Sequence, residues 1–353
     1  MSQFHQLHIN SITRETQKAV SVGFEIPAHL RSEYNFKAGQ YITLRLIING
    51  DEVRRDYSIC TSPKSNELKV AIKEVEHGTF SKYANQSLKI GDAIDVAPPN
   101  GRFVFEPNPA ANRTIAAFAA GSGITPIMSI AKTLLEEEPN STFILIYGNK
   151  TPEDTIFFDE ILRLSSEYGD RFKVKFVFSQ SQEEGALFGR IEKSTVNFII
   201  KNQYKDRDID SFYICGPEQM IYTVKDVLID HGIQKTQILF ELFTVPVAED
   251  SSLDDTVVLE GQTKVTVLID DEEASFVMDQ KKTVLEAALA EDLDAPYSCQ
   301  GGICSSCIAK ITEGKATMRQ NNILTDGELA EGLILTCQAH PTTPTLFVDY
   351  DDV

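Results

Sequence analysis

Hydrophobic residues in the first hundred positions fall into short runs, and clusters of Gly, Pro, Asn and Asp separate these runs. The strand-like runs cover residues 19–26, 41–48, 67–75 and 93–97. Short strands at this spacing, with turn-forming residues between them, favour a small antiparallel barrel. We therefore predict a β-barrel domain over residues 1–108.

From about residue 109 the pattern changes to buried strands that alternate with helices. Continuous apolar runs of strand length cover residues 114–120, 143–147, 172–178, 212–215 and 238–242. Helical stretches lie between them at 127–137, 156–167 and 218–230. This alternation predicts an α/β domain over residues 109–243, in which a doubly wound parallel sheet has helices on both faces.

The last hundred residues return to β structure. Residues 244–256 are acidic and lack periodicity, which is typical of an exposed linker. Strand-like runs at 264–269 and 274–278 flank an acidic turn and predict a hairpin. A short helix is expected at 284–291 and a further strand at 308–312, which gives a third domain over residues 257–353.

Four cysteines in the third domain have a spacing that indicates iron chemistry. Cys299, Cys304 and Cys307 form a C-x4-C-x2-C loop, and Cys337 follows later in the chain. This is the plant-type spacing for a [2Fe–2S] cluster. A structural zinc ion would usually bring a second C-x2-C pair or a His pair, and disulfides need an oxidising compartment. The spacing therefore favours a cluster over zinc or two disulfides.

The charge of the chain limits its partners. The net charge is −19, with 52 acidic and 33 basic side chains, which argues against a nucleic-acid partner. The region 257–353 holds 17 acidic and 6 basic residues, and this acidity suits either a basic docking partner or a solvated face. The chain lacks signal-peptide features and any run of about 18 apolar residues, so we expect a cytoplasmic protein without membrane insertion.

Two glycine turns follow strands of the predicted parallel sheet. Gly121-Ser122-Gly123 leads into a helix, with Pro126 expected at the first helical position, and Cys215-Gly216-Pro217 leads into another. A helix N-terminus after a glycine turn can bind a pyrophosphate, although a structural turn between strand and helix has the same sequence pattern. Because ligands of such sheets bind at the carboxyl ends of strands, both turns could face one nucleotide. Cys215 also fits a buried small apolar position.

The barrel region carries two further motifs. Arg55-Asp56-Tyr57-Ser58 ends a strand-like run, and Gly78-Thr79-Phe80-Ser81 precedes a helical stretch. An Arg can bind a phosphate, a Tyr can pack on a flavin ring, and a helix start can hold a second phosphate. Each motif alone is weak, because R-x-Y-S arises by chance.

The order of all these motifs resembles the ferredoxin–NADP reductase superfamily with a fused C-terminal plant-type ferredoxin domain, over essentially the whole chain. Residues 296–302 and 335–341 most resemble the reductase subunits of phenylacetyl-CoA epoxidase systems. Similar reductases serve other diiron or Rieske oxygenases or desaturases. The resemblance implies a flavin-binding barrel, a nucleotide-binding α/β domain and a β-grasp [2Fe–2S] domain.

The resemblance also implies a role for each motif residue. Flavin, FAD rather than FMN, would be held by Arg55, Tyr57, Ser58, Ile72, Lys73, Gly78, Thr79 and Ser81. The reduced nicotinamide would be received by Gly121, Gly123, Thr125, Pro126, Cys215, Gly216 and Phe243. The residues expected nearest the hydride transfer are Ser58, Thr125, Cys215 and Glu241. The cluster ligands would be Cys299, Cys304, Cys307 and Cys337.

These roles predict an oxidoreductase that passes electrons from NADPH or NADH through FAD and the cluster to a diiron oxygenase. Gln180 stands where many NADPH users carry an Arg, and Arg190 follows downstream, so the residues leave the choice of nucleotide open. A non-enzymatic iron–sulfur or zinc sensor with decayed nucleotide sites is the alternative from a different class. The intact barrel motifs argue against such decay.

Overall fold

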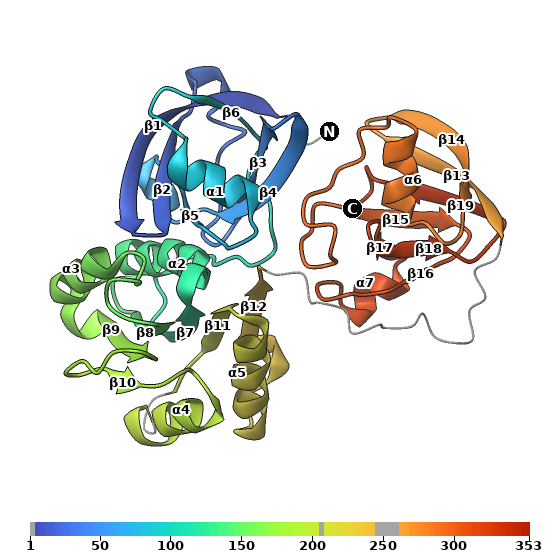
Figure 1. Cartoon of the computed structure of the whole chain (residues 1–353). Coiled ribbons are helices and arrows are strands. Elements are labelled where there is room, and N and C mark those ends of the chain that lie inside the picture. The colour runs from blue at the N-terminus through green and yellow to red at the C-terminus, as the bar shows by residue number, and fades with distance from the viewer. Residues whose placement is uncertain (1–3, 205–207, 244–260) are drawn as a thin grey trace. The chain divides into compact units, whose positions relative to one another are not determined.

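The computed structural model describes residues 4–204, 208–243 and 261–353. The linker predicted at 244–256 lies outside the described residues. Tertiary contacts divide the described chain into two compact units, one over residues 4–243 and one over residues 261–353 (Figure 1).

The first unit begins with an antiparallel barrel, as the hydrophobic pattern predicts. Its strands are β1 (His5–Thr16), β2 (Ala19–Glu25), β3 (Tyr41–Ile48), β4 (Asp51–Ser58), β5 (Leu68–Lys73) and β6 (Ala93–Val96). They lie in the order β4-β3-β6-β1-β2-β5, and an antiparallel bridge between Ile59 and Val70 joins the two outer strands. Helix α1 (Thr79–Gln86) packs on the barrel through Phe80, which belongs to the barrel core.

Strand β1 is a long element that the hydrophobic pattern did not predict. Only Leu7, Ile9 and Thr16 are buried along it, and its second half is polar. Two register shifts against β2 break the alternation further. The Leu7 and Ile9 pair carried the period-two signal, and the polar residues after it hid the rest of the strand.

The second part of the first unit is the predicted doubly wound sheet. Its strands are β7 (Thr114–Ala120), β8 (Thr142–Asn149), β9 (Phe172–Phe178), β10 (Leu187–Phe188), β11 (Ser211–Gly216) and β12 (Ile238–Leu242). All pairings are parallel, in the order β10-β9-β8-β7-β11-β12. The helices are α2 (Ile124–Glu137), α3 (Phe158–Tyr168), α4 (Lys193–Phe198) and α5 (Glu218–Asp230). Helices α2 and α3 cover one face of the sheet, and α4 and α5 cover the other (Figure 1).

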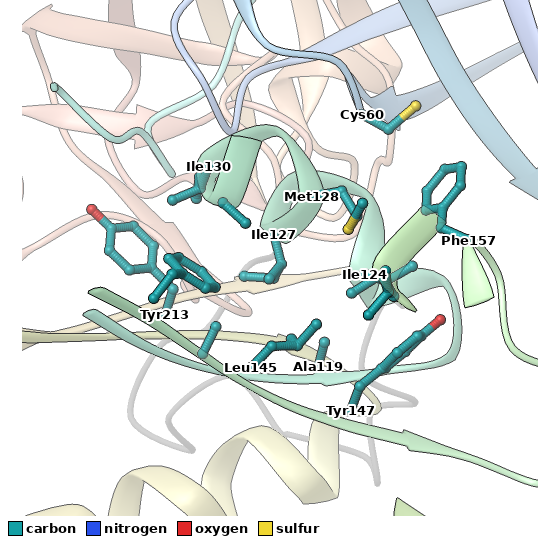
Figure 2. Packing of buried hydrophobic residues seen from close by; sticks show 14 of the residues in the cluster. Cys60, Ala119, Ile124, Ile127, Met128, Ile130, Leu145, Tyr147, Phe157 and Tyr213 are labelled. Atoms are coloured by element: carbon teal, nitrogen blue, oxygen red, sulfur yellow. The ribbon is translucent and has the colours of Figure 1, made fainter. Parts of the chain in front are cut away.

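Helix α2 lies between the sheet and the barrel. Its apolar side chains Ile124 and Ile127 point to Ala119 and Leu145 on the sheet (Figure 2). The same buried cluster includes Cys60 from the barrel. The barrel and the α/β part are therefore joined by one continuous core that contains α2.

The second unit is a small mixed sheet crossed by a helix. Its main sheet has the order β14-β13-β19-β15-β17, and only the β13–β19 pair is parallel. The strands are β13 (Gln262–Ile269), β14 (Glu272–Asp279), β15 (Ile308–Glu313), β17 (Leu333–Leu335) and β19 (Thr345–Asp349), with β16 (Ala316–Met318) and β18 (Ala339–Pro341) in a separate pair. Helix α6 (Val284–Ala290) packs its apolar residues into the core of this unit, and α7 (Asp326–Ala330) lies near its surface. This is the β-grasp arrangement that the resemblance implied.

Local signals explain why the predicted hairpin and helix of this unit form. Asp270 and Asp271 both have positive φ values, 53° and 62°, as a tight type I′ turn between β13 and β14 requires. Thr283 and Glu286 form a reciprocal capping box at the start of α6. None of the helices in the described ranges has the length and apolar character needed to cross a membrane.

Candidate active site

The two predicted glycine turns meet where the strand order of the parallel sheet reverses, between β7 and β11. A Cβ atom on Gly123 would lie 2.2 Å from the Cys215 carbonyl oxygen and 2.6 Å from Gly216 N. Gly123 is therefore required for the contact between the two turns, rather than only for the approach of a ligand. In contrast, a Cβ on Gly121 would meet only Lys73 Nζ, at 3.3 Å, and Gly121 has a φ of +55°.

The turn after β7 is fixed by its own hydrogen bonds. Tyr147 Oη donates to the Gly121 carbonyl at 2.9 Å, and Thr125 Oγ1 donates to the Ser122 carbonyl at 3.0 Å. The expected position of Pro126 was wrong: α2 begins at Ile124, so Pro126 is the third helical residue. A proline is tolerated there because the amides of the first helical turn have no acceptor within the helix.

Three of the four residues expected nearest the hydride transfer come together at this junction. Ser58 Oγ, at the end of β4, donates to Glu241 Oε2 of β12 at 3.2 Å. Cys215 and Glu241 are direct neighbours in the β11–β12 pairing. Thr125 is buried at the start of α2, and the contact of Gly123 with Cys215 links its turn to the group.

Burial determines the protonation of this group. It raises the pKa of Glu241 to about 8, while the hydrogen bond from Ser58 opposes the rise and the nearby Asp56 adds to it. Burial also raises the pKa of the Cys215 thiol, and so does the charge of Glu241. The Cys215 side chain is therefore a neutral thiol, which packs as a small polarizable group and is no nucleophile.

The predicted flavin residues of the barrel lie on β4 and β5. Arg55 is exposed, and its Nη1 donates to the Arg54 carbonyl at 2.6 Å. The Tyr57 ring lies 5.5 Å from the Phe80 ring, and burial raises the pKa of Tyr57, which keeps the phenol protonated. On β5, Ile72 is fully buried in the barrel core, so its side chain supports the strand.

The Gly78 motif forms the start of α1. Gly78 caps the helix, and Thr79 is the first helical residue. A Cβ on Gly78 would lie 2.3 Å from Ser81 Oγ, which accepts a hydrogen bond from Val75 N at 3.2 Å. The glycine thus allows a compact turn whose first-turn amides can face an anion.

Lys73 lies between the barrel and the α/β part. Its ammonium group is near Gly121, and burial lowers its pKa while Asp154 opposes that change. A half-buried cation beside a glycine without a side chain can receive a nucleotide phosphate. The pattern of the sequence alone did not bring Lys73 and Gly121 together, because 48 positions separate them.

Three further positions complete the junction. A Cβ on Gly216 would lie 2.8 Å from Met220 Cε and 3.1 Å from Ala120 N, so this glycine also permits a close approach. Phe243 ends the first unit with 38% of its surface exposed, and its predicted role near the flavin stays a prediction. Asn149, which the sequence reasoning missed, ends β8, and no described residue accepts a hydrogen bond from its buried Nδ2.

The four predicted cluster cysteines converge in the second unit as two pairs. The thiol of Cys304, with nearby backbone amides, lowers the pKa of Cys299 to about 6. The thiol of Cys307 lowers the pKa of Cys337, and the same contact raises that of Cys307. All six cysteines of the chain are free thiols, so the disulfide alternative is wrong for this structure.

This pairing fits two metal ions better than one. Among the described residues, no group of three or more His, Cys, Asp or Glu side chains converges on a single ion position. In a [2Fe–2S] cluster each iron takes two thiolates from the protein, whereas a structural zinc ion takes four ligands. The loop also offers hydrogen bonds to sulfur, because Gly301 N donates to Cys299 Sγ at 3.3 Å and Gln338 Nε2 lies 3.7 Å from Cys337 Sγ.

Comparisons with known families assign the three regions. Residues 6–105 match the oxidoreductase FAD-binding domain, residues 118–226 match the oxidoreductase NAD-binding domain, and residues 267–342 match the 2Fe-2S iron-sulfur cluster binding domain. The chain is thus an oxidoreductase with domains for FAD, a nicotinamide nucleotide and a [2Fe–2S] cluster. These matches exclude the structural-zinc interpretation of the cysteine loop.

Individual relatives match the chain from end to end. It is 36% identical to a subunit of the 1,2-phenylacetyl-CoA epoxidase of Escherichia coli over 353 residues, with 99% of each chain covered. It is 29% identical to the ferredoxin reductase component of 3-ketosteroid-9-alpha-monooxygenase from Rhodococcus rhodochrous, covering 98% of this chain and 96% of the relative.

Among solved structures, phthalate dioxygenase reductase shares the fold with a TM-score of 0.61, at 24% identity and with 98% of both chains covered. A ferredoxin NADP+ reductase from Neisseria gonorrhoeae matches with a TM-score of 0.57, at 23% identity, over 68% of this chain and 98% of its own. The chain therefore belongs to the ferredoxin–NADP reductase superfamily, in the group with a fused 2Fe-2S domain to which the matching subunit of 1,2-phenylacetyl-CoA epoxidase also belongs.

Proposed function

We propose that this protein is the reductase component of a phenylacetyl-CoA epoxidase system and delivers electrons from a nicotinamide nucleotide to its diiron oxygenase. The observation that carries this proposal is the pairing of a nucleotide-type junction, at Ser58, Glu241 and Cys215, with a four-thiol loop in the same chain. Full-length similarity to a component of that epoxidase makes this acceptor the first candidate. Other diiron or Rieske oxygenases and desaturases are the alternative acceptors.

The described residues fit the flavin and the nucleotide. The first-turn amides of α1 and the exposed Arg55 offer donors for a flavin phosphate, and Tyr57 offers an aromatic face. The open space at Gly121 beside Lys73 suits the phosphates of the nucleotide. When bound, the flavin and the cluster supply the conversion of a two-electron donor into single-electron deliveries.

The residues of the chain supply position and a dry, neutral environment. Ser58 and Glu241 join the barrel to the edge of the parallel sheet, and near neutral pH Glu241 holds a proton because its pKa is about 8. The buried Cys215 thiol adds no charge. A neutral junction keeps water and competing protons away from the place where the ring systems would meet.

The same reasoning extends to compartment and nucleotide. Four thiols that bind iron, and two further buried free thiols, suit the reducing cytoplasm, where we place this protein. The segment after β9 carries Gln180, Glu183 and Glu184 and no basic residue between 179 and 186, which favours NADH over NADPH.

Reconstitution tests the proposal. The purified reductase is mixed with the oxygenase component of a phenylacetyl-CoA epoxidase and with NADH, and epoxide formation is followed alongside reduction of cytochrome c. We expect both reactions. Cytochrome c reduction without any epoxide formation, together with turnover of a different oxygenase, would transfer the protein to one of the alternative acceptors.

A further inference from the structure

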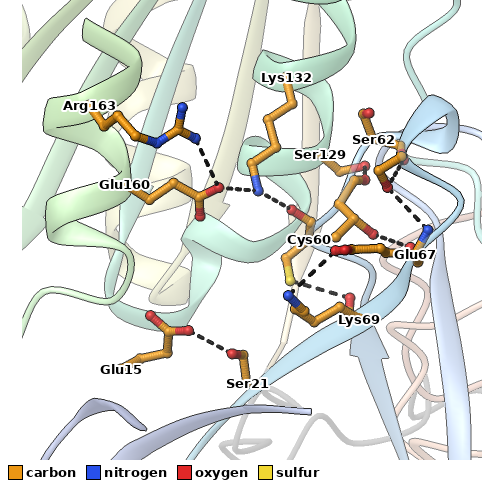
Figure 3. A network of polar contacts seen from close by, with 12 residues as sticks. Glu15, Ser21, Cys60, Ser62, Glu67, Lys69, Ser129, Lys132, Glu160 and Arg163 are labelled. Carbon is orange, nitrogen blue, oxygen red and sulfur yellow. Dashed lines mark hydrogen bonds and ion pairs between the residues drawn. The ribbon is translucent and has the colours of Figure 1, made fainter. Parts of the chain in front are cut away.

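Helix α2 connects the nucleotide turn to the segment that directly follows the flavin motif. Its N-terminus follows the Gly121–Gly123 turn. Further along, the polar residues Ser129, Lys132 and Glu136 lie at spacings of three and four, so they share one face of the helix. Each of them contacts one residue of the segment 60–62 in the barrel (Figure 3).

The contacts of this face are short and mostly buried. Ser129 Oγ donates to the Thr61 carbonyl at 2.6 Å in a fully buried bond. Lys132 Nζ donates to the Cys60 carbonyl at 3.1 Å, and Ser62 Oγ donates to Glu136 Oε2 at 2.5 Å. Figure 3 shows the first two bonds reaching adjacent carbonyl groups of the barrel segment.

Lys132 is held from several sides. Only 14% of its side chain is exposed, and its ammonium lies 2.8 Å from Glu160 Oε1 of α3 and 5.8 Å from the centre of the Phe157 ring. Burying a lysine is costly unless the charge is paired and hydrogen-bonded, and both conditions are met here. Glu160 and the Cys60 carbonyl therefore fix the ammonium between α3 and the barrel.

The barrel segment has little freedom to adjust. Cys60 N donates to the Lys69 carbonyl at 2.9 Å, and Thr61 Oγ1 donates to the Glu67 carbonyl at 2.6 Å. Ser58 stands two residues before Cys60. A displacement of α2 would thus change the distance between Ser58 and the nucleotide turn at Thr125.

We propose that Lys132 and Ser129 are positioning residues that set the distance between the flavin residues of β4 and the nucleotide turn of α2. This inference rests on the proposed roles of Ser58 and Thr125. Hydride transfer depends steeply on the separation of the reacting atoms, and a displacement of about 1 Å can cost about 100-fold in rate. Neither residue needs to touch a cofactor for this effect.

The test uses the full-length holoprotein with the substitutions Lys132→Met and Ser129→Ala. Lys64→Met is the matched control, since Lys64 pairs with Glu137 of the same helix at 3.1 Å but is 62% exposed. Flavin reduction by NADH is followed by stopped-flow absorbance over a range of NADH concentrations. Hydrogen exchange of residues 58–64 and 121–125 is measured in parallel, without nucleotide.

We expect Lys132→Met and Ser129→Ala to slow flavin reduction about 10- to 100-fold at saturating NADH, with the apparent NADH affinity within about twofold of the parent. Both should also raise exchange in the two segments, and Lys64→Met should do neither. Faster exchange with an unchanged reduction rate would overturn the inference. If Lys132→Met does not fold, Ser129→Ala decides by the same criteria. Failure of NADH to reduce the parent protein would instead refute the proposed function.

Discussion

The protonated carboxyl group of Glu241 yields a prediction whose sign and size follow from the structure. Its folded-state pKa is about 8, against an ordinary value of 4.5. The folded protein therefore binds a proton that the unfolded chain releases between these two pH values. Folding stability must fall as the pH rises from about 4.5 to about 8, and it is unaffected by this group outside that window.

The substitution Glu241→Gln removes this ionisation and keeps an oxygen that can accept the hydrogen bond from Ser58. A pKa shift of this size corresponds to at most about 5 kcal/mol, and partial access of water to the side chain reduces this to about 2–4 kcal/mol. We expect the variant to match the parent near pH 4.5 and to exceed its stability by about 2–4 kcal/mol at pH 8.5.

Urea unfolding at several pH values, followed by far-UV circular dichroism, measures this difference. The exposed Glu25, at the end of β2, provides a control in Glu25→Gln, which should leave the pH profile of the parent unchanged. A Glu241→Gln variant with the same stability difference from the parent at pH 5 and pH 8.5 would refute a raised pKa. A variant that loses stability relative to the parent at pH 8.5 would show that the carboxylate is stabilising, which also contradicts the argument.

Three further predictions concern the turn, the cluster and the nucleotide. Gly123→Ala should lower the free energy of unfolding by about 2–4 kcal/mol, because its Cβ would overlap the Cys215 carbonyl; calorimetry should show the loss, and Gly327→Ala, with its nearest atom at 3.9 Å, should not share it. Cys304→Ser should reduce bound iron and the visible absorbance of the cluster, with flavin content retained; full iron occupancy by metal analysis would remove Cys304 from the ligand set. Gln180→Arg should raise the ratio of kcat/KM for NADPH to that for NADH at least about tenfold, and an unchanged ratio would place the 2′ position of the nucleotide elsewhere.

The elements most accurately predicted from the sequence are those whose periodicity comes from full burial. The limits predicted for β7, β9 and α5 coincide with the observed ones, because continuous apolar or helical runs end there at polar or glycine residues. Strand β1 escaped prediction because only its first half alternates. Pro126 was placed two positions too early, since the tight turn at Gly121–Gly123 is not part of α2.

The site was predictable as separate motifs and not as an arrangement. The resemblance supplied Ser58 and Glu241 individually, but their hydrogen bond spans 183 positions and depends on how β12 meets β4. The reason for Gly123 also changed, from the approach of a ligand to the contact with Cys215. Lys132 and Ser129 carry no motif at all, because their partners are backbone carbonyl groups that any sequence supplies.

The central claim is that one chain takes electrons from a nicotinamide nucleotide and passes them to a four-cysteine cluster. An anaerobic titration of the purified protein with NADH, followed by visible absorbance and EPR, tests it most directly. The account predicts that the flavin bands bleach and that an EPR signal of a reduced [2Fe–2S] cluster appears in the same titration. A protein that contains zinc instead of iron, or a cluster that stays oxidised while the flavin is fully reduced, would contradict it.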